Sequence, residues 1–443
     1  MFEFKTETDL KAFDGFVREN KGSYLQCSKW SEVKKAWGSR FYSGFHNGER
    51  VLTCLVLIRK LPAAGEIWYI PCGALCDYTD KTLQKEFADF LKAEMKRAKA
   101  TCAIIDPLIP LRINNEPCEE GKNAHNLLTE CGYRLNPKIE TYTYKHPVQT
   151  YIDLRDGDGN IIPADKILHG CEKGVRYSVR IGTQRGLESE TFFYDDIVKN
   201  PKIMDDFMSV MHDTSGRNDF VERDSEYCRH LLEVFKDYSD ITVVYYNKKK
   251  DRELEAERQL KKQECLKALE TAPEKKIKGL KNDIEAIDGN TRNFEIRMNE
   301  TADYSDDARI PVAGGFTLRY SGIASCLFGG TRNIIRNNTR SSHYLNYLRI
   351  CRSIEQGCDI HDLGYVLVKS PEIQENGTLG HMEPTENFIG INEFKLSFGA
   401  KYYEFIGEYV LVGNGLKYYL YDSLMPKAKK MTMKIVRKIR KRG

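Results

Sequence analysis

Residues 387–412, NFIGINEFKLSFGAKYYEFIGEYVLV, contain a helix signal, a stop signal and a strand signal in direct succession. Phe394 and Phe398 are four residues apart, which places two rings on one face of a helix, and Gly399 follows where a left-handed cap is expected. Beyond Gly399, aromatic and β-branched residues alternate with other residues as far as Tyr409. The stretch therefore predicts a helix that ends at Gly399 and is followed by one strand.

Lys395 lies next to Phe394 but outside the stripe that Phe394 and Phe398 form. One interpretation is a solvated surface lysine. The other is a cation that two aromatic rings hold at a cleft. The pattern by itself leaves both interpretations open.

Composition and charge restrict the class of protein. The 443 residues suffice for two or three domains, and 41% hydrophobic and 30% charged residues are typical of globular proteins. The net charge of +4 is small, so an anionic partner would have to be bound by a local patch. The start, MFEFKTETDLKAFDGF, is unlike a signal peptide, and no apolar run reaches membrane-spanning length. We therefore expect a cytoplasmic protein.

Known metal and cofactor motifs do not occur in the sequence. The 13 cysteines are scattered without a CxxC repeat or a Cys/His ligand pattern, so we expect free thiols and no metal site. We also expect no cofactor. There is no P-loop, Rossmann glycine fingerprint, GxSxG elbow or HExxH motif, which leaves the commonest motif-bearing enzyme classes without support.

Changes of pattern along the chain predict how it is divided. One charge-dense segment is nearly free of glycine and proline, and extended patterns lie on both sides of it. We therefore expect this segment to be an insertion within the second of two domains. The expected regions are a first domain (1–148), a second domain (149–246 and 301–425), an inserted helical arm (247–300) and a basic tail (426–443).

The arm has the apolar spacing of paired helices. Four residues repeat at intervals of three and four, the narrow seam of a coiled coil: Ile277, Leu280, Ile284 and Ile287. The opposite helix is expected at residues 252–270, with these seam residues: Leu254, Leu260, Leu266 and Leu269. The poorer register of that helix favours a two-helix antiparallel arm that turns near Pro273 over a long oligomeric coiled coil.

Two basic segments have an ordinary and a functional interpretation each. The first carries Lys173, Arg176, Arg180 and Arg185. It is either a solvated helix face or a site for phosphates, because the arginine fork suits them. The second is the tail at 426–443, whose lysines and arginines alternate with apolar residues. It is either a solvated tail or a weak amphipathic helix that contacts a membrane surface.

Several short motifs, taken in order, resemble the Fem family of aminoacyltransferases, which includes FemA, FemX and MurM-like proteins. They are WSEVK at 30–34, IIDP at 104–107, RDSEYC at 223–228, FGGT at 328–331, IHDLGY at 360–365 and NEFKLSFG at 392–399. No single motif is specific, but their order is, and the resemblance covers nearly the whole chain.

The resemblance implies a fold and an activity. The fold is α+β, with two acetyltransferase-like (GNAT-like) domains and the helical arm inserted in the second. The activity is transfer of an amino acid from aminoacyl-tRNA to the side-chain amine of a peptidoglycan precursor, either lipid II or UDP-MurNAc-pentapeptide. Presence of the arm favours the lipid-linked acceptor. A related Fem-type protein is a further expected partner.

The resemblance also implies roles for particular residues. Lys34, Arg223 and Tyr227 match the contacts to the phosphates of the precursor, and Lys395 with Phe394 matches the catalytic cleft. Phe328 takes the place of a tyrosine found in some members of the family, and Thr101 stands where an aromatic residue is expected. With aminoacyl-tRNA as donor, the expected RNA contacts are Lys173, Arg176, Arg180 and Arg185.

The expected chemistry needs few groups. An aminoacyl ester is already activated, so the enzyme has to juxtapose the amine and the ester and stabilise a transient oxyanion. Lys395 can supply the positive charge. Asp106 is expected to position the amine or accept its proton; the alternative is a turn cap before Pro107. Competing interpretations of the whole chain are an acyl-CoA-type N-acyltransferase, although no CoA pyrophosphate loop is found, and a non-catalytic RNA-binding or scaffolding protein.

Overall fold

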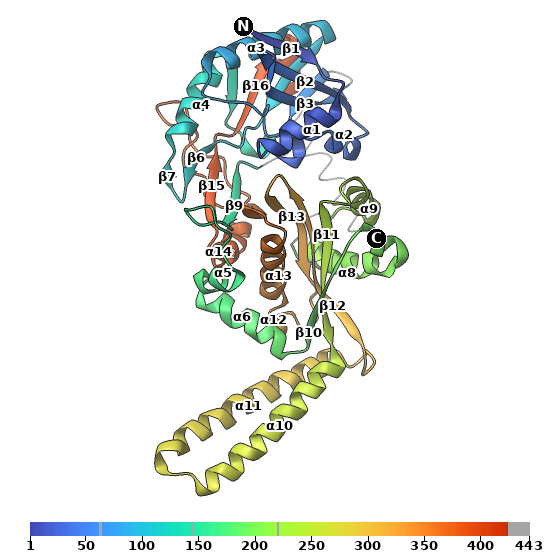
Figure 1. Ribbon diagram of the computed structural model, residues 1–443, viewed down its shortest axis with the longest axis vertical. Coiled ribbons are helices and arrows are strands. Elements are labelled where there is room, and N and C mark those ends of the chain that lie inside the picture. Colours follow the sequence, from blue (N-terminus) through green and yellow to red (C-terminus); the bar gives the residue numbers. More distant parts are fainter. Residues whose placement is uncertain (62–63, 143–145, 219–220, 424–443) are drawn as a thin grey trace.

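The computed structural model describes residues 1–61, 64–142, 146–218 and 221–423. Figure 1 shows an elongated molecule with one sheet in each of two halves, and a helical hairpin that projects from the far end of the second half. The first sheet, in spatial order, contains β1 (Phe2–Thr6), β2 (Gly38–His46), β3 (Glu49–Leu61), β4 (Gly65–Ile70), β5 (Ala100–Ile105), β16 (Glu408–Val412) and β8 (Tyr133–Asn136).

The second sheet repeats the plan of the first. Its strands, in spatial order, are β10 (Leu187–Phe192), β11 (Ser239–Asn247), β12 (Arg309–Tyr320), β13 (Ile323–Thr331), β14 (Ile360–Tyr365), β9 (Val148–Asp153), β15 (Lys401–Phe405), β6 (Pro110–Ile113) and β7 (Glu116–Pro117). In each sheet four consecutive antiparallel strands are followed by one parallel pair, β4 with β5 and β13 with β14. The two halves are thus a duplication of one arrangement.

Helices cover the sheets. Those of the first half are α1 (Leu10–Glu19), α2 (Ser28–Val33), α3 (Lys81–Ala98) and α4 (Glu119–Glu130). Those of the second half are α5 (Ala164–Gly170), α6 (Lys173–Gln184), α7 (Tyr194–Lys199), α8 (Lys202–Asn218), α9 (Ser225–Val234), α12 (Arg336–Thr339), α13 (Ser341–Glu355) and α14 (Ile389–Leu396). Aspartate side chains cap the N-termini of α3 and α9. Asp80 accepts a hydrogen bond from Leu83 N at 2.9 Å, and Asp224 accepts one from Tyr227 N at 2.8 Å.

The segment after α14 differs from the single strand that the sequence predicts. It forms two strands, β15 and β16, which belong to different sheets. The break lies at Gly407, whose φ of 97° is in the left-handed region. A Cβ there would lie 2.6 Å from the Tyr142 hydroxyl, so glycine is required for space as well as for conformation. Period-two alternation continues across the break, which is why the sequence conceals it.

The two halves exchange strands across the predicted boundary at residue 148. β6 and β7 precede that boundary but belong to the second sheet, whereas β16 follows it and belongs to the first. One apolar core also spans both halves, because Phe13 and Trp30 share it with Leu231 and Phe316. Burial of a shared core fixes the halves against each other, so a cleft between them has a defined shape.

The arm consists of α10 (Lys248–Thr271) and α11 (Glu274–Glu300), which pack against each other on either side of Pro273. Ile287 is buried in the seam, as predicted. Leu260 and Leu266 were expected in the seam of α10 but are exposed, whereas the neighbouring Cys265 is buried. Coiled-coil geometry for the arm stays a prediction.

The predicted basic tail, 426–443, lies outside the described residues, so its interpretation is untested. Within the described part of the chain, none of the helices combines the length and the apolar character that a membrane crossing requires.

Candidate functional site

A cavity of about 390 Å³ lies where the two halves meet. Its first wall comes from the segment between α1 and α2, and its second from the start of α9 and the facing parts of β13 and β14. The lining residues used below are Trp30, His146, Arg223, Tyr227, Phe328, Cys326, Asp362, Gly364 and Tyr365. Three of the residues predicted to contact the substrate, Arg223, Tyr227 and Phe328, are therefore in one wall.

Lys34 joins this group from the first half. It is the C-cap of α2, and its Nζ lies 4.9 Å from the ring centre of Trp30 and 5.9 Å from that of Tyr227. The Arg223 guanidinium lies 4.8 Å from the same Tyr227 ring. α2 and α9 are held together by Lys29, whose Nζ donates to Val234 O at 3.1 Å. The structure thus brings together the three predicted phosphate contacts.

The charges of this group favour an anion. Burial, and then the positive charge of Arg223, lower the pKa of Lys34 to about 8. Two cations that repel each other beside a cavity are stabilised by any anion that binds between them, and phosphate oxygens suit both an ammonium and a guanidinium. Phe328 completes this wall, with its ring 6.5 Å from that of Tyr227 and 5.7 Å from that of Phe316.

Lys395 is half-buried and contacts β14 at two residues that line the cavity. Its Nζ donates to Gly364 O at 2.9 Å and to Tyr365 O at 2.7 Å. Successive carbonyls of a regular strand point to opposite sides, so both can accept from one ammonium only because the strand is irregular here. The pairing of β14 with β9 indeed shifts between Asp362 and Tyr365, and Gly364 has a φ of 90°.

This geometry corrects one expectation about how Lys395 is held. The two carbonyls hold Lys395, rather than the aromatic rings. Phe394 turns away from the cavity, with its ring 4.9 Å from His343 and 5.3 Å from Phe398. Burial lowers the pKa of Lys395 to about 8, and the charges of Asp362 and Cys326 act in the opposite direction. An ammonium has three N–H donors, so a third is available beyond the two carbonyl contacts.

Asp106 occupies a different position from the other predicted site residues. It directly follows β5 and is 6% exposed, and like Lys34 and Lys395 it does not belong to the cavity lining among the described residues. Its two carboxylate oxygens accept from the Tyr69 hydroxyl at 2.7 Å and from Cys72 N at 2.6 Å. Cys72 has a φ of 61°, so Asp106 stabilises a left-handed turn. The contacts are those of a capping carboxylate, and its role with the amine stays a prediction.

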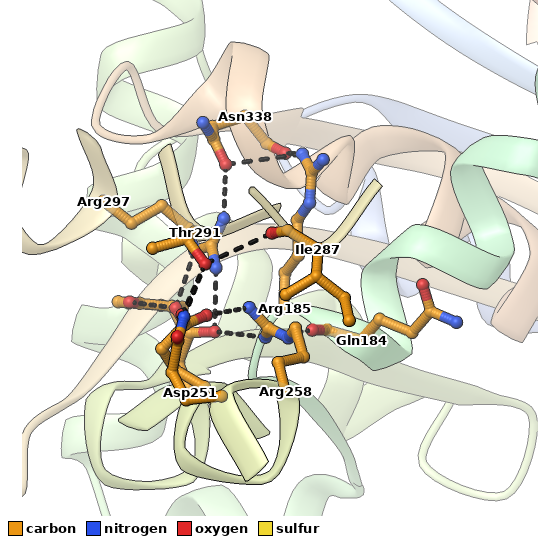
Figure 2. A network of polar contacts seen from close by, with 11 residues as sticks. Gln184, Arg185, Asp251, Arg258, Ile287, Thr291, Arg297 and Asn338 are labelled. Atoms are coloured by element: carbon orange, nitrogen blue, oxygen red, sulfur yellow. Dashed lines mark hydrogen bonds and ion pairs between the residues drawn. The ribbon is translucent and has the colours of Figure 1, made fainter. Parts of the chain in front are cut away.

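The four predicted RNA contacts do not form one surface. Lys173, Arg176 and Arg180 are exposed on α6. Arg185, however, is 8% exposed and donates through Nη1 to the carbonyl oxygen of Asn338. Figure 2 shows Arg185 within a polar network at the base of the arm. The reason is that Arg185 follows the last turn of α6, where the chain passes into the second sheet.

The network around Arg185 is built on one buried ion pair. Arg297 and Asp251, one from each helix of the arm, are both fully buried and make two contacts of 2.7 and 2.8 Å (Figure 2). Arg297 also donates to Asn338 Oδ1 at 2.6 Å, and Asp251 accepts from the Tyr246 hydroxyl at 2.7 Å. These contacts fix the arm to the second sheet.

Two groups in the cavity wall were not singled out from the sequence. Asp362 lies inside the IHDLGY motif, and His146 stacks on Tyr365 with ring centres 4.7 Å apart. The available signal for Asp362 was the glycine two residues later, because a glycine inside a strand pattern often marks a bulge. No comparable signal points to His146.

Comparisons with known proteins agree over nearly the whole chain. Proteins named lipid II:glycine glycyltransferase are similar to it: that of Staphylococcus epidermidis is 24% identical over 96% of this chain and 97% of its own length. That of Staphylococcus aureus is 25% identical over 97% of each. A crystal structure of FemX superposes with a TM-score of 0.69 and 21% identity, covering 96% of this chain and all of the other.

The superposition on FemX, together with the duplicated sheets, confirms the predicted α+β fold with two domains of similar architecture. The model of the FemAB family matches residues 8–425, which includes both halves, the arm and every predicted site residue. The chain belongs to the FemAB family.

Proposed function

We propose that the protein transfers an amino acid from aminoacyl-tRNA to the side-chain amine in the stem peptide of lipid II. The observation that carries this proposal is that Lys34 and Arg223 both lie against Tyr227 in the cavity wall, while Lys395 contacts the carbonyls of Gly364 and Tyr365 in the same wall. A non-catalytic scaffold would not need these groups to meet. The similar staphylococcal proteins, named for glycine transfer to lipid II, favour a lipid-linked acceptor over a nucleotide-linked one.

The acceptor is bound through its diphosphate. Lys34 and Arg223 supply two positive charges from different halves of the molecule, and these lie 5.9 and 4.8 Å from the centre of the Tyr227 ring. Charge-assisted contacts to phosphate contribute roughly 1.5–3 kcal/mol each. With the diphosphate placed there, the stem peptide follows the cavity towards Lys395.

Lys395 acts on the ester of the donor. When the neutral amine attacks the ester carbonyl, a C–N bond forms and negative charge develops on the carbonyl oxygen. Collapse of this intermediate breaks the ester C–O bond and releases the ribose hydroxyl of the tRNA, so that the proton lost by the amine balances the one gained by the leaving oxygen. The Gly364 and Tyr365 carbonyls hold the Lys395 ammonium in one orientation, so that its remaining N–H can meet this oxygen. A preoriented cation stabilises the transition state more than the ground state, which is what accelerates a reaction.

The donor RNA is bound outside the cavity. Lys173, Arg176 and Arg180 on α6 are exposed, and the network in Figure 2 joins the end of α6 to the base of the arm. We assign these three cations and the arm to RNA contacts. The basic tail at 426–443, outside the described residues, is assigned to the anionic membrane surface at which lipid II resides.

Mass measurement of the acceptor tests the reaction. Purified protein is incubated with lipid II and a pool of charged tRNAs, and we expect a mass gain of one amino-acid residue. Ribonuclease treatment of the pool should abolish the gain. If UDP-MurNAc-pentapeptide is modified and lipid II is not, the acceptor is the nucleotide-linked precursor and the proposed lipid-linked acceptor is wrong. A gain that survives ribonuclease, or depends on an acyl-CoA, would overturn the proposed donor.

A further inference from the structure

Asp362 is a carboxylate in the cavity wall for which the proposed reaction has no role so far. It lies in β14, is 7% exposed and lines the cavity together with Arg223 and Phe328. Its Oδ1 accepts from Gly364 N at 2.8 Å, which fixes the orientation of the carboxylate. A carboxylate that faces a cavity can bind a cationic group of a ligand.

Asp362 and Lys395 are brought to the same turn by the bulge of β14. Asp362 pairs with Tyr151 of β9, Tyr365 pairs with Gln149, and the register slips between them. Lys395 donates to the carbonyls of the two last residues of this turn. A Cβ on Gly364 would lie at ordinary contact distance from Lys395 Nζ, 3.7 Å, and from Cys326 O, 3.5 Å, so Lys395 lies directly beside this turn. The carboxylate of Asp362 and the ammonium of Lys395 are therefore both held by the same turn.

The donor carries the complementary pair of charges. In an aminoacyl ester under attack, the developing oxyanion is on the carbonyl carbon, and the α-ammonium is on the next carbon. The acceptor amine is a poorer fit, because it reacts only when neutral and a paired carboxylate would favour its protonated, unreactive form. The two protein charges thus match the two charges of the donor.

We propose that Asp362 binds the α-ammonium of the aminoacyl group while Lys395 contacts its carbonyl oxygen. This assignment rests on the proposed function and makes the site selective for an ester with a free α-amino group. Asp362 holds the ammonium and does not exchange a proton or a bond with the substrate. Its effect is on which donor is accepted and how the donor is oriented.

The test compares two donors that differ in the α-amino group alone. The charged tRNA that the wild-type protein uses is compared with the same tRNA after nitrous acid has converted the α-amino group to a hydroxyl. Contacts to a charged group correspond to a factor of about 10–100. We expect the wild type to prefer the amino donor by that factor in kcat/KM, and Asp362→Asn to reduce the preference to within about threefold.

Three variants together make the result specific. Asp362→Asn retains an oxygen for the Gly364 N–H, and Asp362→Glu retains the charge and should restore most of the preference. Asp359→Asn is the matched control, because Asp359 is on the same segment but pairs with Lys21 and Arg155. It should leave the preference unchanged.

Three results would overturn the assignment. The first is that Asp362→Asn lowers kcat/KM equally for both donors. The second is that this variant raises the KM for lipid II and leaves the donor preference unaltered. A wild type that uses both donors equally well is the third. Failure of the proposed function itself looks different, because the wild type would then transfer from neither donor.

Discussion

The cleft and the base of the arm both gather arginine, lysine and acidic side chains, but the charges face different surroundings. At the base of the arm, Arg297 and Asp251 are fully buried and satisfy each other. In the cleft, Lys34 and Arg223 stand beside a cavity and repel each other. Buried charges that compensate each other hold the structure together, whereas like charges beside a cavity are suited to binding a ligand of opposite charge. The two clusters should therefore respond oppositely to substitution.

The largest expected effect is on folding, at the base of the arm. Arg297→Leu leaves Asp251 buried without its bidentate partner, and breaking such a pair typically costs about 3–5 kcal/mol. Urea unfolding should show this loss in the free energy of unfolding. The double variant Asp251→Leu/Arg297→Leu removes both charges and should recover part of it. If the single variant is within about 1 kcal/mol of wild type, the pair does not hold the arm.

The second effect is on binding, in the cleft. Arg223→Ala should raise the KM for lipid II about tenfold or more, because a lost charge-assisted contact costs roughly 1.5–3 kcal/mol. Its stability should be nearly unchanged, since Arg223 is exposed. Arg180→Ala is the matched control: Arg180 is also an exposed arginine, but on α6, and the KM for lipid II should not change. An unaltered KM in Arg223→Ala would remove Arg223 from the site.

The third effect is on pH dependence. The acceptor amine must be neutral, so the rate first rises with pH. Burial lowers the pKa of Lys395 to about 8, so above that pH its positive charge is lost and kcat should fall. Lys34 titrates in the same range, but its loss should appear in the KM for lipid II. In Lys395→Arg the falling limb of kcat should move to higher pH. A limb that stays near 8 would assign it to another group.

The smallest expected effect concerns the outer part of the arm. Removing all of 247–300 would also remove Asp251 and Arg297, so the informative variant replaces 266–284 with a short flexible loop. This variant should keep the wild-type free energy of unfolding and KM for lipid II, while the KM for charged tRNA rises several-fold. An unchanged KM for tRNA would exclude the outer arm from RNA binding.

The sequence predicted those features that repeat or match a motif. Period and spacing gave the arm and the helix before Gly399, and the order of motifs gave the family. The sequence pattern did not predict the split between β15 and β16, because the alternation of side chains continues unbroken across Gly407. Arg185 and Arg223 look alike in sequence, and only the packing at the end of α6 buries the first. Asp362 escaped because its position depends on a bulge formed against β9, which is distant in the chain.

The central claim is that the cleft is catalytic and that Lys395 supplies the charge. Single-turnover transfer to lipid II from pre-charged tRNA, with both substrates saturating, compares Lys395→Met with wild type. Methionine retains much of the volume of the side chain and removes its charge. We expect normal folding, binding of both substrates within a few-fold of wild type, and a rate lower by about 10²–10³, as for loss of one oxyanion contact. A rate within threefold of wild type would contradict the claim.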